Sequence, residues 1–191
     1  MPLSTPKSRR EVHYRVLDMK TFARDDGLFD VEGHLVDCKP FVTERSGNSE
    51  PVAAGQPRHD MWVRLTVDNT FVVRDVEAVS DTTPFGVCKE AAPSLAAVIG
   101  MSISSGWSIR VKERLRGAAS CTHLMEMLIP LATVALQGIN GLNIAKRRAT
   151  VNAEGTPIKI DTCYAYARSS PVVKMLWPAH YRPRNVKVPD A

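Results

Sequence analysis

One stretch, RDDGLFDVEGHLVDC at residues 24–38, decides the fold that we expect for this chain. Its Asp25-Asp26-Gly27 segment is a strong hairpin turn signal. The residues after the turn read as a strand, and residues 19–23 before it are expected to form the antiparallel partner. The stretch therefore predicts a first hairpin.

A second hairpin follows from two β-branched runs at residues 61–67 and 71–79, which are joined around Asp68-Asn69. The stretch between the hairpins, 43–58, is rich in Gly, Pro, Ser and Glu and reads as a long exposed loop. Two hairpins together favour one antiparallel sheet.

The pattern becomes helical after Pro84. Short helices are expected at 91–99 and 107–115, and a long amphipathic helix is expected from Ser120, with its apolar face packed on the sheet. Pro130 should kink this helix, and residues 138–143 should end it. Further on, 158–167 is strand-like and 172–177 is a short segment. Strands followed by helices indicate an α+β fold, an antiparallel sheet of two or more hairpins packed against a C-terminal helical layer with one long kinked helix.

Length and composition favour a single domain over residues 1–191, with tails at 1–12 and 182–191. No apolar run approaches the roughly 18 to 20 residues of a membrane span, and the polar, basic N-terminus lacks a secretory signal. We therefore expect a cytoplasmic protein whose four cysteines stay free thiols. The net charge is +5, and the basic residues that produce it are dispersed along the sequence, which argues against nucleic-acid binding. These basic residues could instead bind an anionic or phenolic ligand.

Three of the five histidines stand in compact polar motifs, EGHL at 32–35, HDMW at 59–62 and CTHL at 121–124. Imidazole beside carboxylate, thiol or hydroxyl is the chemistry of proton transfer and metal ligation. In the first motif, strand alternation puts Asp30, Glu32 and His34 on one face, as a solvated surface or the floor of a pocket. The histidine motifs predict a chemical site.

In the second motif, His59 and Asp60 lie where the long loop enters the second hairpin. Trp62 and Arg64 share a strand face and could hold a phenolic or carboxylated ring. The alternative is a loop-end histidine with Trp62 in the core. Both interpretations stay open at this point.

The third motif places His123 in the first turn of the long helix, where the helix dipole favours a neutral imidazole. Cys121 would feel the same dipole, yet it falls on the apolar face and could be a buried hydrophobe. The two side chains cannot form a direct nucleophile–base pair, because residues two apart on a helix point about 200° apart. A cysteine hydrolase is therefore disfavoured.

A metal site can be drawn from Asp81, Cys88, Cys121 and His123. The order of elements over residues 61–137 resembles that of the iron-sulfur scaffold proteins related to the sulfur-transfer accessory fold. The Gly-Cys-Ala motif of those scaffolds is missing, because Val87-Cys88-Lys89 stands in its place. This resemblance is an analogy of fold.

Over about residues 14–181, the chain also resembles a bacterial family catalogued as a domain of unknown function. The matching stretches are RDDGL at 24, EGHL at 32, HDMW at 59, RDVEAVSD at 74, CTHL at 121, IDTC at 160 and LWP at 176. Its members are associated with a γ-formaldehyde lyase that opens lignin-derived phenylcoumaran dimers to stilbenes. The family often has histidine where this chain has Tyr164, which puts that position's role in doubt.

The resemblance implies a carbon–carbon lyase that needs no cofactor, acts on a small aromatic substrate and uses neither nucleic acid nor a membrane as partner. His123 or His59 would act as the base, and Glu32 or Asp60 would orient it. The substrate would be held by four side chains: Trp62, Arg64, His34 and Tyr164. The alternative is a non-enzymatic metal-binding or scaffold-like module that uses Asp81, Cys88, Cys121 and His123. Homo-oligomerisation is left open.

Overall fold

The structure is a computed structural model that describes residues 3–44, 50–145, 151–152 and 154–184. The chain divides into two compact units, Met1–Ile139 and Asn140–Ala191. The single domain expected from the sequence stays a prediction.

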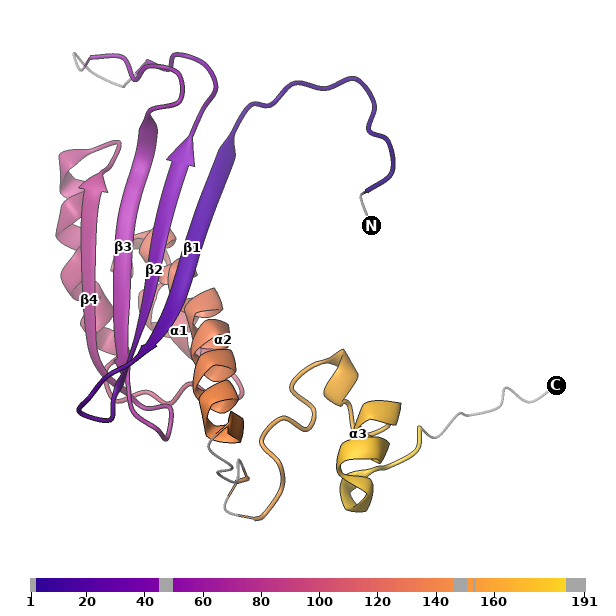
Figure 1. Ribbon diagram of the computed structural model, residues 1–191. Coiled ribbons are helices and arrows are strands. Elements are labelled where there is room, and N and C mark those ends of the chain that lie inside the picture. The colour runs from indigo at the N-terminus through magenta and orange to yellow at the C-terminus, as the bar shows by residue number, and fades with distance from the viewer. Residues whose placement is uncertain (1–2, 45–49, 146–150, 153, 185–191) are drawn as a thin grey trace. The chain divides into compact units, whose positions relative to one another are not determined.

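The first unit is built on a four-stranded antiparallel sheet in the order β1-β2-β3-β4, so each strand pairs with the next along the chain (Figure 1). The strands are β1 Tyr14–Ala23, β2 Phe29–Cys38, β3 Pro57–Val67 and β4 Val73–Thr82. Both predicted hairpins are confirmed. β1 begins at Tyr14, well before the expected residue 19, and it pairs with β2 along its whole length.

The helical layer follows the strands, which confirms the α+β fold. Its elements are η1 Gly86–Val98, α1 Trp107–Leu115, η2 Gly117–Ala119 and α2 Thr122–Ala145. α1 has the predicted bounds, whereas residues 91–98 of the helix expected at 91–99 belong to the 3-10 segment η1, which begins earlier, at Gly86. The predicted end of the long helix at 138–143 is wrong: α2 runs through Gly138 and Gly141. A glycine costs a helix only about 1 kcal/mol, which packing offsets. The kink at Pro130 stays a prediction.

The second unit contains η3 Tyr164–Tyr166, α3 Pro171–Leu176 and η4 Pro178–His180. The strand predicted at 158–167 is wrong, because this stretch forms turns and η3. Asp161 adopts a positive φ of 62°, and its carboxylate accepts hydrogen bonds from the backbone N–H and Nε of Arg168. The stretch 161–168 is therefore held by hydrogen bonds between its own residues. The segment at 172–177 is helical, with Ser170 capping α3.

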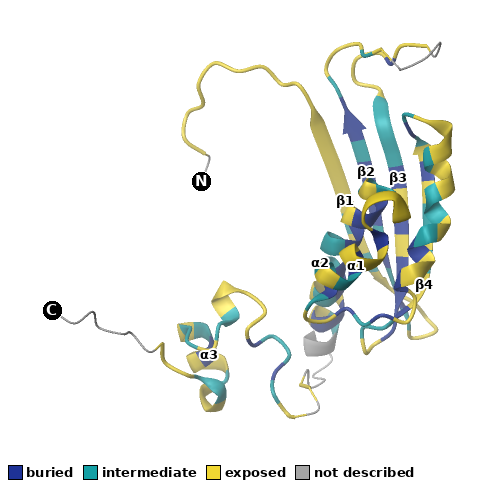
Figure 2. Cartoon of the chain, turned by 180° about the vertical axis from the view of Figure 1, so that it is seen from behind, coloured by how far each residue is buried: buried dark blue, intermediate teal, exposed yellow. Residues whose placement is uncertain are grey.

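Within the first unit, the helices cover one face of the sheet, and the other face is open (Figure 2). Alternate residues of β2 and β3 point into the core and are buried, among them Val31, Leu35 and Leu65. Gly33 lets α2 approach closely, because a Cβ there would lie 3.1 Å from Leu131 Cδ2. This contact confirms that the apolar face of the long helix packs on the sheet.

Residues Thr122–Leu142 of α2 are long and apolar enough to cross a membrane by length and composition, with a mean hydropathy of 1.2. The expectation that no stretch approaches a membrane span is therefore wrong. Helices from the core of a soluble protein pass the same test, and α2 packs its apolar face on the sheet.

Gly138 gives a prediction about helix packing. A Cβ at Gly138 would lie 2.8 Å from Thr21 Cβ and 2.9 Å from Thr21 Cγ2 on β1. Helix propensity alone would favour Gly138→Ala by about 1 kcal/mol, but the overlap with Thr21 outweighs that gain. We expect Gly138→Ala to lower the free energy of unfolding by about 1 to 2 kcal/mol in urea titration.

The matched control is Gly141→Ala in the same helix, where a Cβ meets nothing within 4 Å. This replacement should raise the free energy of unfolding by up to about 1 kcal/mol. If both replacements changed the free energy of unfolding by the same amount, contact with Thr21 would not be the reason that Gly138→Ala destabilises the protein.

Asp68 organises the turn between β3 and β4. Its carboxylate accepts hydrogen bonds from the backbone N–H groups of Thr70 and Val72 and from the Arg74 guanidinium. Burial opposes the charged form, but these hydrogen bonds outweigh burial and lower the pKa of Asp68 to about 2. The same bonds hold Phe71 at a positive φ of 65°.

Because the folded pKa of Asp68 lies below the unfolded value of about 3.9, its stabilisation is fully present above about pH 4 and is lost as pH falls toward 2. We expect Asp68→Asn to cost about 1 to 2 kcal/mol of unfolding free energy at pH 7 and much less at pH 2. Urea titrations at both pH values measure the difference. A cost that does not change with pH would contradict this account.

Candidate functional site

A buried carboxylate lies at the end of β2, on the face that the helices cover. Asp37 continues the core-facing alternation of Val31 and Leu35, and its side chain is only 3% exposed. Arg15 stands opposite it on β1 and donates two hydrogen bonds, Nε to Oδ1 at 2.6 Å and Nη2 to Oδ2 at 2.7 Å. This two-pronged pairing fixes the carboxylate plane.

Two histidines face the same carboxylate oxygen. His59 is the register partner of Asp37 on β3, and its Nδ1 lies 3.1 Å from Asp37 Oδ2. His123, in the first turn of α2, places Nε2 at 3.6 Å from that oxygen. The two imidazole centroids are 3.9 Å apart, with the rings tilted by 34°. We call Arg15, Asp37, His59 and His123 the Asp37 cluster.

Three further side chains border the Asp37 cluster. His13 Nε2 lies 3.4 Å from Asp37 Oδ1, and Glu126 Oε2 lies 3.7 Å from Arg15 Nη1. Cys121 Sγ is 3.9 Å from His123 Nδ1, so the expectation that these two side chains point apart is wrong. Cys121 precedes α2, and the angular spacing of helical residues does not apply to it. The cluster therefore draws on three strands and the start of α2, which lie far apart in sequence.

Both imidazoles of the Asp37 cluster favour the neutral form. Burial lowers the pKa of His59, and the neighbouring His123 lowers it further. Burial also lowers the pKa of His123, with the positive charge of Arg15 adding to the effect. For Asp37, burial opposes ionisation, but the hydrogen bonds and charge of Arg15 win, so its pKa is lowered. At neutral pH the cluster holds an ionised carboxylate beside two neutral bases.

This arrangement is suited to proton transfer. A hydrogen bond from His59 Nδ1 to the ionised Asp37 requires the proton on Nδ1, which leaves Nε2 as the proton acceptor. His123 at ring-contact distance can give or take a second proton. An imidazolium formed on either ring would be stabilised by Asp37.

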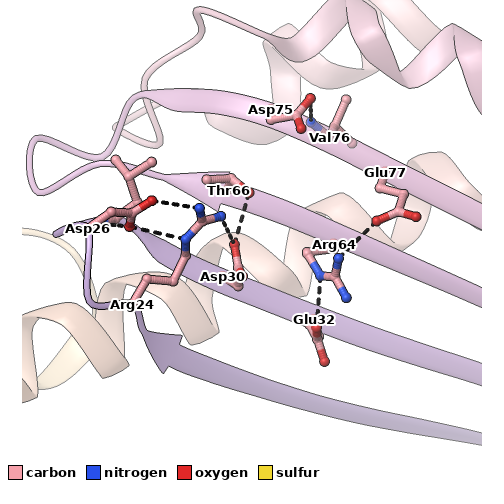
Figure 3. A network of polar contacts seen from close by, with 10 residues as sticks. Arg24, Asp26, Asp30, Glu32, Arg64, Thr66, Asp75, Val76 and Glu77 are labelled. Atoms are coloured by element: carbon pink, nitrogen blue, oxygen red, sulfur yellow. Dashed lines mark hydrogen bonds and ion pairs between the residues drawn. The ribbon is translucent and has the colours of Figure 1, made fainter.

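The predicted residues Glu32, His34, Asp60, Trp62 and Arg64 lie on the open face of the sheet. His34 Nε2 is 2.7 Å from Asp60 Oδ1, and its ring stacks on Trp62 with centroids 3.7 Å apart. Arg64 donates to Glu32 at 2.8 Å and to Glu77 at 2.9 Å (Figure 3). Trp62, 42% exposed, is not a core residue. The stripe of Asp30, Glu32 and His34 lies on this face, where Glu32, Trp62 and Arg64 line a pocket.

The predicted site residues are therefore divided between two faces. Consecutive residues of a strand point to opposite sides of the sheet, so His59 enters the Asp37 cluster while Asp60 faces away. Glu32 and Asp60, expected to orient the base, make no contact with His59 or His123 among the described residues. Asp37 takes that position instead.

The other predicted residues do not join the cluster. Tyr164 lies in η3 of the second unit and is 86% exposed. In the part of the chain that the structure describes, Asp81, Cys88, Cys121 and His123 do not come together as a group of metal ligands. All four cysteines are free thiols.

Sequence reasoning missed Asp37, Arg15 and His13. One signal for Asp37 was present, because strand alternation put this carboxylate on the same face as Val31 and Leu35. A charged residue at a buried position needs a partner, which points to a site. Arg15 and His13 lay before the expected start of the first strand.

Comparison with known proteins gives one match. The profile of the family described as "Protein of unknown function (DUF2889)" matches residues 13–137. No curated protein and no solved structure matches the chain. The matched range contains every member of the Asp37 cluster and ends before Tyr164. With about two thirds of its length covered, the chain belongs to the DUF2889 family.

Proposed function

We propose that this protein is a cofactor-independent carbon–carbon lyase in which His59 and His123 act as general base and general acid. The observation that supports this proposal is the pair of neutral imidazoles, 3.9 Å apart, beside the ionised Asp37. Two proton-transfer groups at contact distance suit a reaction that takes one proton and returns one.

The proposed reaction is the opening of a phenylcoumaran ring to a stilbene with release of formaldehyde. The base takes the proton of the primary hydroxyl, whose oxygen becomes the carbonyl oxygen of formaldehyde as the adjacent carbon–carbon bond breaks. The released electron pair forms the stilbene double bond while the aryl ether bond breaks. The phenolate then takes a proton from the acid. Atoms and electrons balance without an oxidant or reductant.

Each member of the Asp37 cluster has a role in this scheme. One histidine takes the hydroxyl proton and becomes an imidazolium. This proton passes through the neighbouring ring to the phenolate, so both imidazoles are neutral again at the end. Asp37 orients His59 and stabilises the imidazolium, and Arg15 holds Asp37. The proposal does not use Trp62, Arg64 or His34, because these side chains lie across the sheet from the histidine pair.

The substrate class rests on the resemblance of the EGHL, HDMW and CTHL motifs to the lyase-associated family. The proposal includes a small aromatic substrate and a cytoplasmic location, with neither nucleic acid nor membrane as partner. The rival module that uses Asp81, Cys88, Cys121 and His123 has no support in the geometry of the described residues.

The test is formaldehyde release when EDTA-treated protein is incubated with a phenylcoumaran diol. Wild-type protein should release formaldehyde and stilbene in equal amounts, and His123→Ala should release them at least about 100-fold more slowly. His34→Ala is the matched control, since this histidine also pairs with an aspartate but lies on the open face. No release by concentrated wild-type protein would refute the proposed reaction.

A further inference from the structure

Three possible ligand atoms of the Asp37 cluster face one point. Asp37 Oδ2 lies 3.1 Å from His59 Nδ1 and 3.6 Å from His123 Nε2, and all three atoms lie within 4.8 Å of one another. The longer distance exceeds that of an ordinary hydrogen bond. Two imidazoles are thus directed at one oxygen, and of these two rings the His59 ring alone hydrogen-bonds to it, beside the bond from Arg15 Nη2.

These separations match the edges of a metal coordination polyhedron. Zinc binds nitrogen and oxygen ligands at about 2.0 to 2.1 Å in a tetrahedral arrangement, which puts neighbouring ligand atoms roughly 3.3 Å apart. The 3.1 and 3.6 Å separations lie on either side of that value. Two imidazoles and one carboxylate are also a donor set that divalent transition metals prefer.

Neighbouring side chains orient the three possible ligands, as residues that hydrogen-bond to metal ligands do in known metal sites. Arg15 fixes the Asp37 carboxylate, and Cys121 Sγ lies 3.9 Å from the other ring nitrogen of His123. Glu126 offsets part of the Arg15 charge. The side chains of His59 and His123 are 17% and 26% exposed, which gives an ion and a water ligand access.

We propose that Asp37, His59 and His123 bind a divalent transition-metal ion, and that the bound ion switches off proton transfer by the histidine pair. In a coordinated imidazole one ring nitrogen is bound to the metal and the other carries a proton, so neither can accept one. The inhibition rests on the proposed function. The binding rests on the geometry alone.

The test is isothermal titration of EDTA-treated full-length protein with ZnCl2. Wild-type protein should bind one Zn²⁺ ion, and His59→Ala and His123→Ala should each weaken that binding at least about 100-fold. His34→Ala should change it less than about threefold. In parallel, CoCl2 added to wild-type protein should give the visible absorption of Co²⁺ with nitrogen and oxygen ligands.

A second readout covers variants that fold poorly. In nitrogen-15 spectra of wild-type protein, stoichiometric Co²⁺ should broaden the imidazole signals of His59 and His123 and leave those of His34 sharp. Weak binding by wild-type protein, or broadening centred on His34, would overturn the proposed site.

The same titration in the formaldehyde assay separates the site from the function. Loss of release in proportion to bound Zn²⁺ supports both binding and inhibition. Release that requires Zn²⁺ would keep the site but overturn the inhibition and the cofactor-free reaction. Release by protein that binds no Zn²⁺ would keep the lyase and overturn the metal site.

Discussion

Replacing both histidines, His59→Ala with His123→Ala, should slow formaldehyde release no further than the more harmful single replacement does. Each single replacement is expected to lower kcat/KM by about 10² to 10⁴-fold, since either loss breaks the transfer of a proton in and a proton out. The rings lie 3.9 Å apart and share Asp37, so they should act as one unit. Residues that act as a unit have non-additive effects.

The measurement is kcat/KM for the wild-type protein, both single variants and the double variant, all treated with EDTA. Multiplied losses in the double variant would mean that the histidines act independently, which contradicts a shared proton path. His34→Ala should stay within about twofold of wild type. Circular dichroism spectra of each variant exclude loss of fold as the cause.

Asp37→Asn should lower kcat/KM by about 10³-fold and also destabilise the fold. The amide cannot stabilise an imidazolium or hold His59 with its proton on Nδ1. It also removes the buried carboxylate that Arg15 pairs with, leaving Glu126 as the remaining carboxylate near the guanidinium. Because the Arg15 side chain is 32% exposed, we expect a loss of about 1 to 3 kcal/mol, below that for a fully buried pair.

The stability cost of Asp37→Asn should depend on pH in one direction. The pKa of Asp37 is lowered in the folded protein, so its contribution is present at neutral pH and is lost as pH falls through the folded pKa. Urea titrations at neutral and acid pH should therefore show a cost that shrinks in acid.

Asp60→Asn, which alters the pair with His34 on the open face, is the matched control. A loss of activity as large in Asp60→Asn would contradict the role assigned to Asp37.

Local sequence signals predicted most of the first unit. The turn at Asp25-Asp26-Gly27 and the β-branched runs around Asp68-Asn69 gave four adjacent strands, because hairpin turns act over a few residues. The errors arose where tertiary context decides. Packing carries α2 through Gly138, and local hydrogen bonds of Asp161 form turns in a stretch with strand-like composition.

The site was predicted only in part for the same reason. Polar motifs pointed to His59 and His123, and the structure brings these two rings together. Their shared partner Asp37 precedes His59 by 22 residues in the sequence. Two strands and the helices before α2 lie between Asp37 and His123. Strand alternation also divides neighbours, so Asp60 next to His59 serves His34 instead. A motif shows which residue types occur together, but not which face of the sheet each one reaches.

Gly33 and Gly138 set how closely α2 lies against the sheet, and one histidine of the pair comes from each layer. The distance between the His59 and His123 rings therefore changes with the spacing between the sheet and α2. A side chain added at Gly33, in the middle of β2, would push Leu131 and Met127 outward and separate the rings without touching either one. Proton transfer would then weaken through core packing alone, so the histidine pair that we propose as catalytic depends on two positions that carry no functional group.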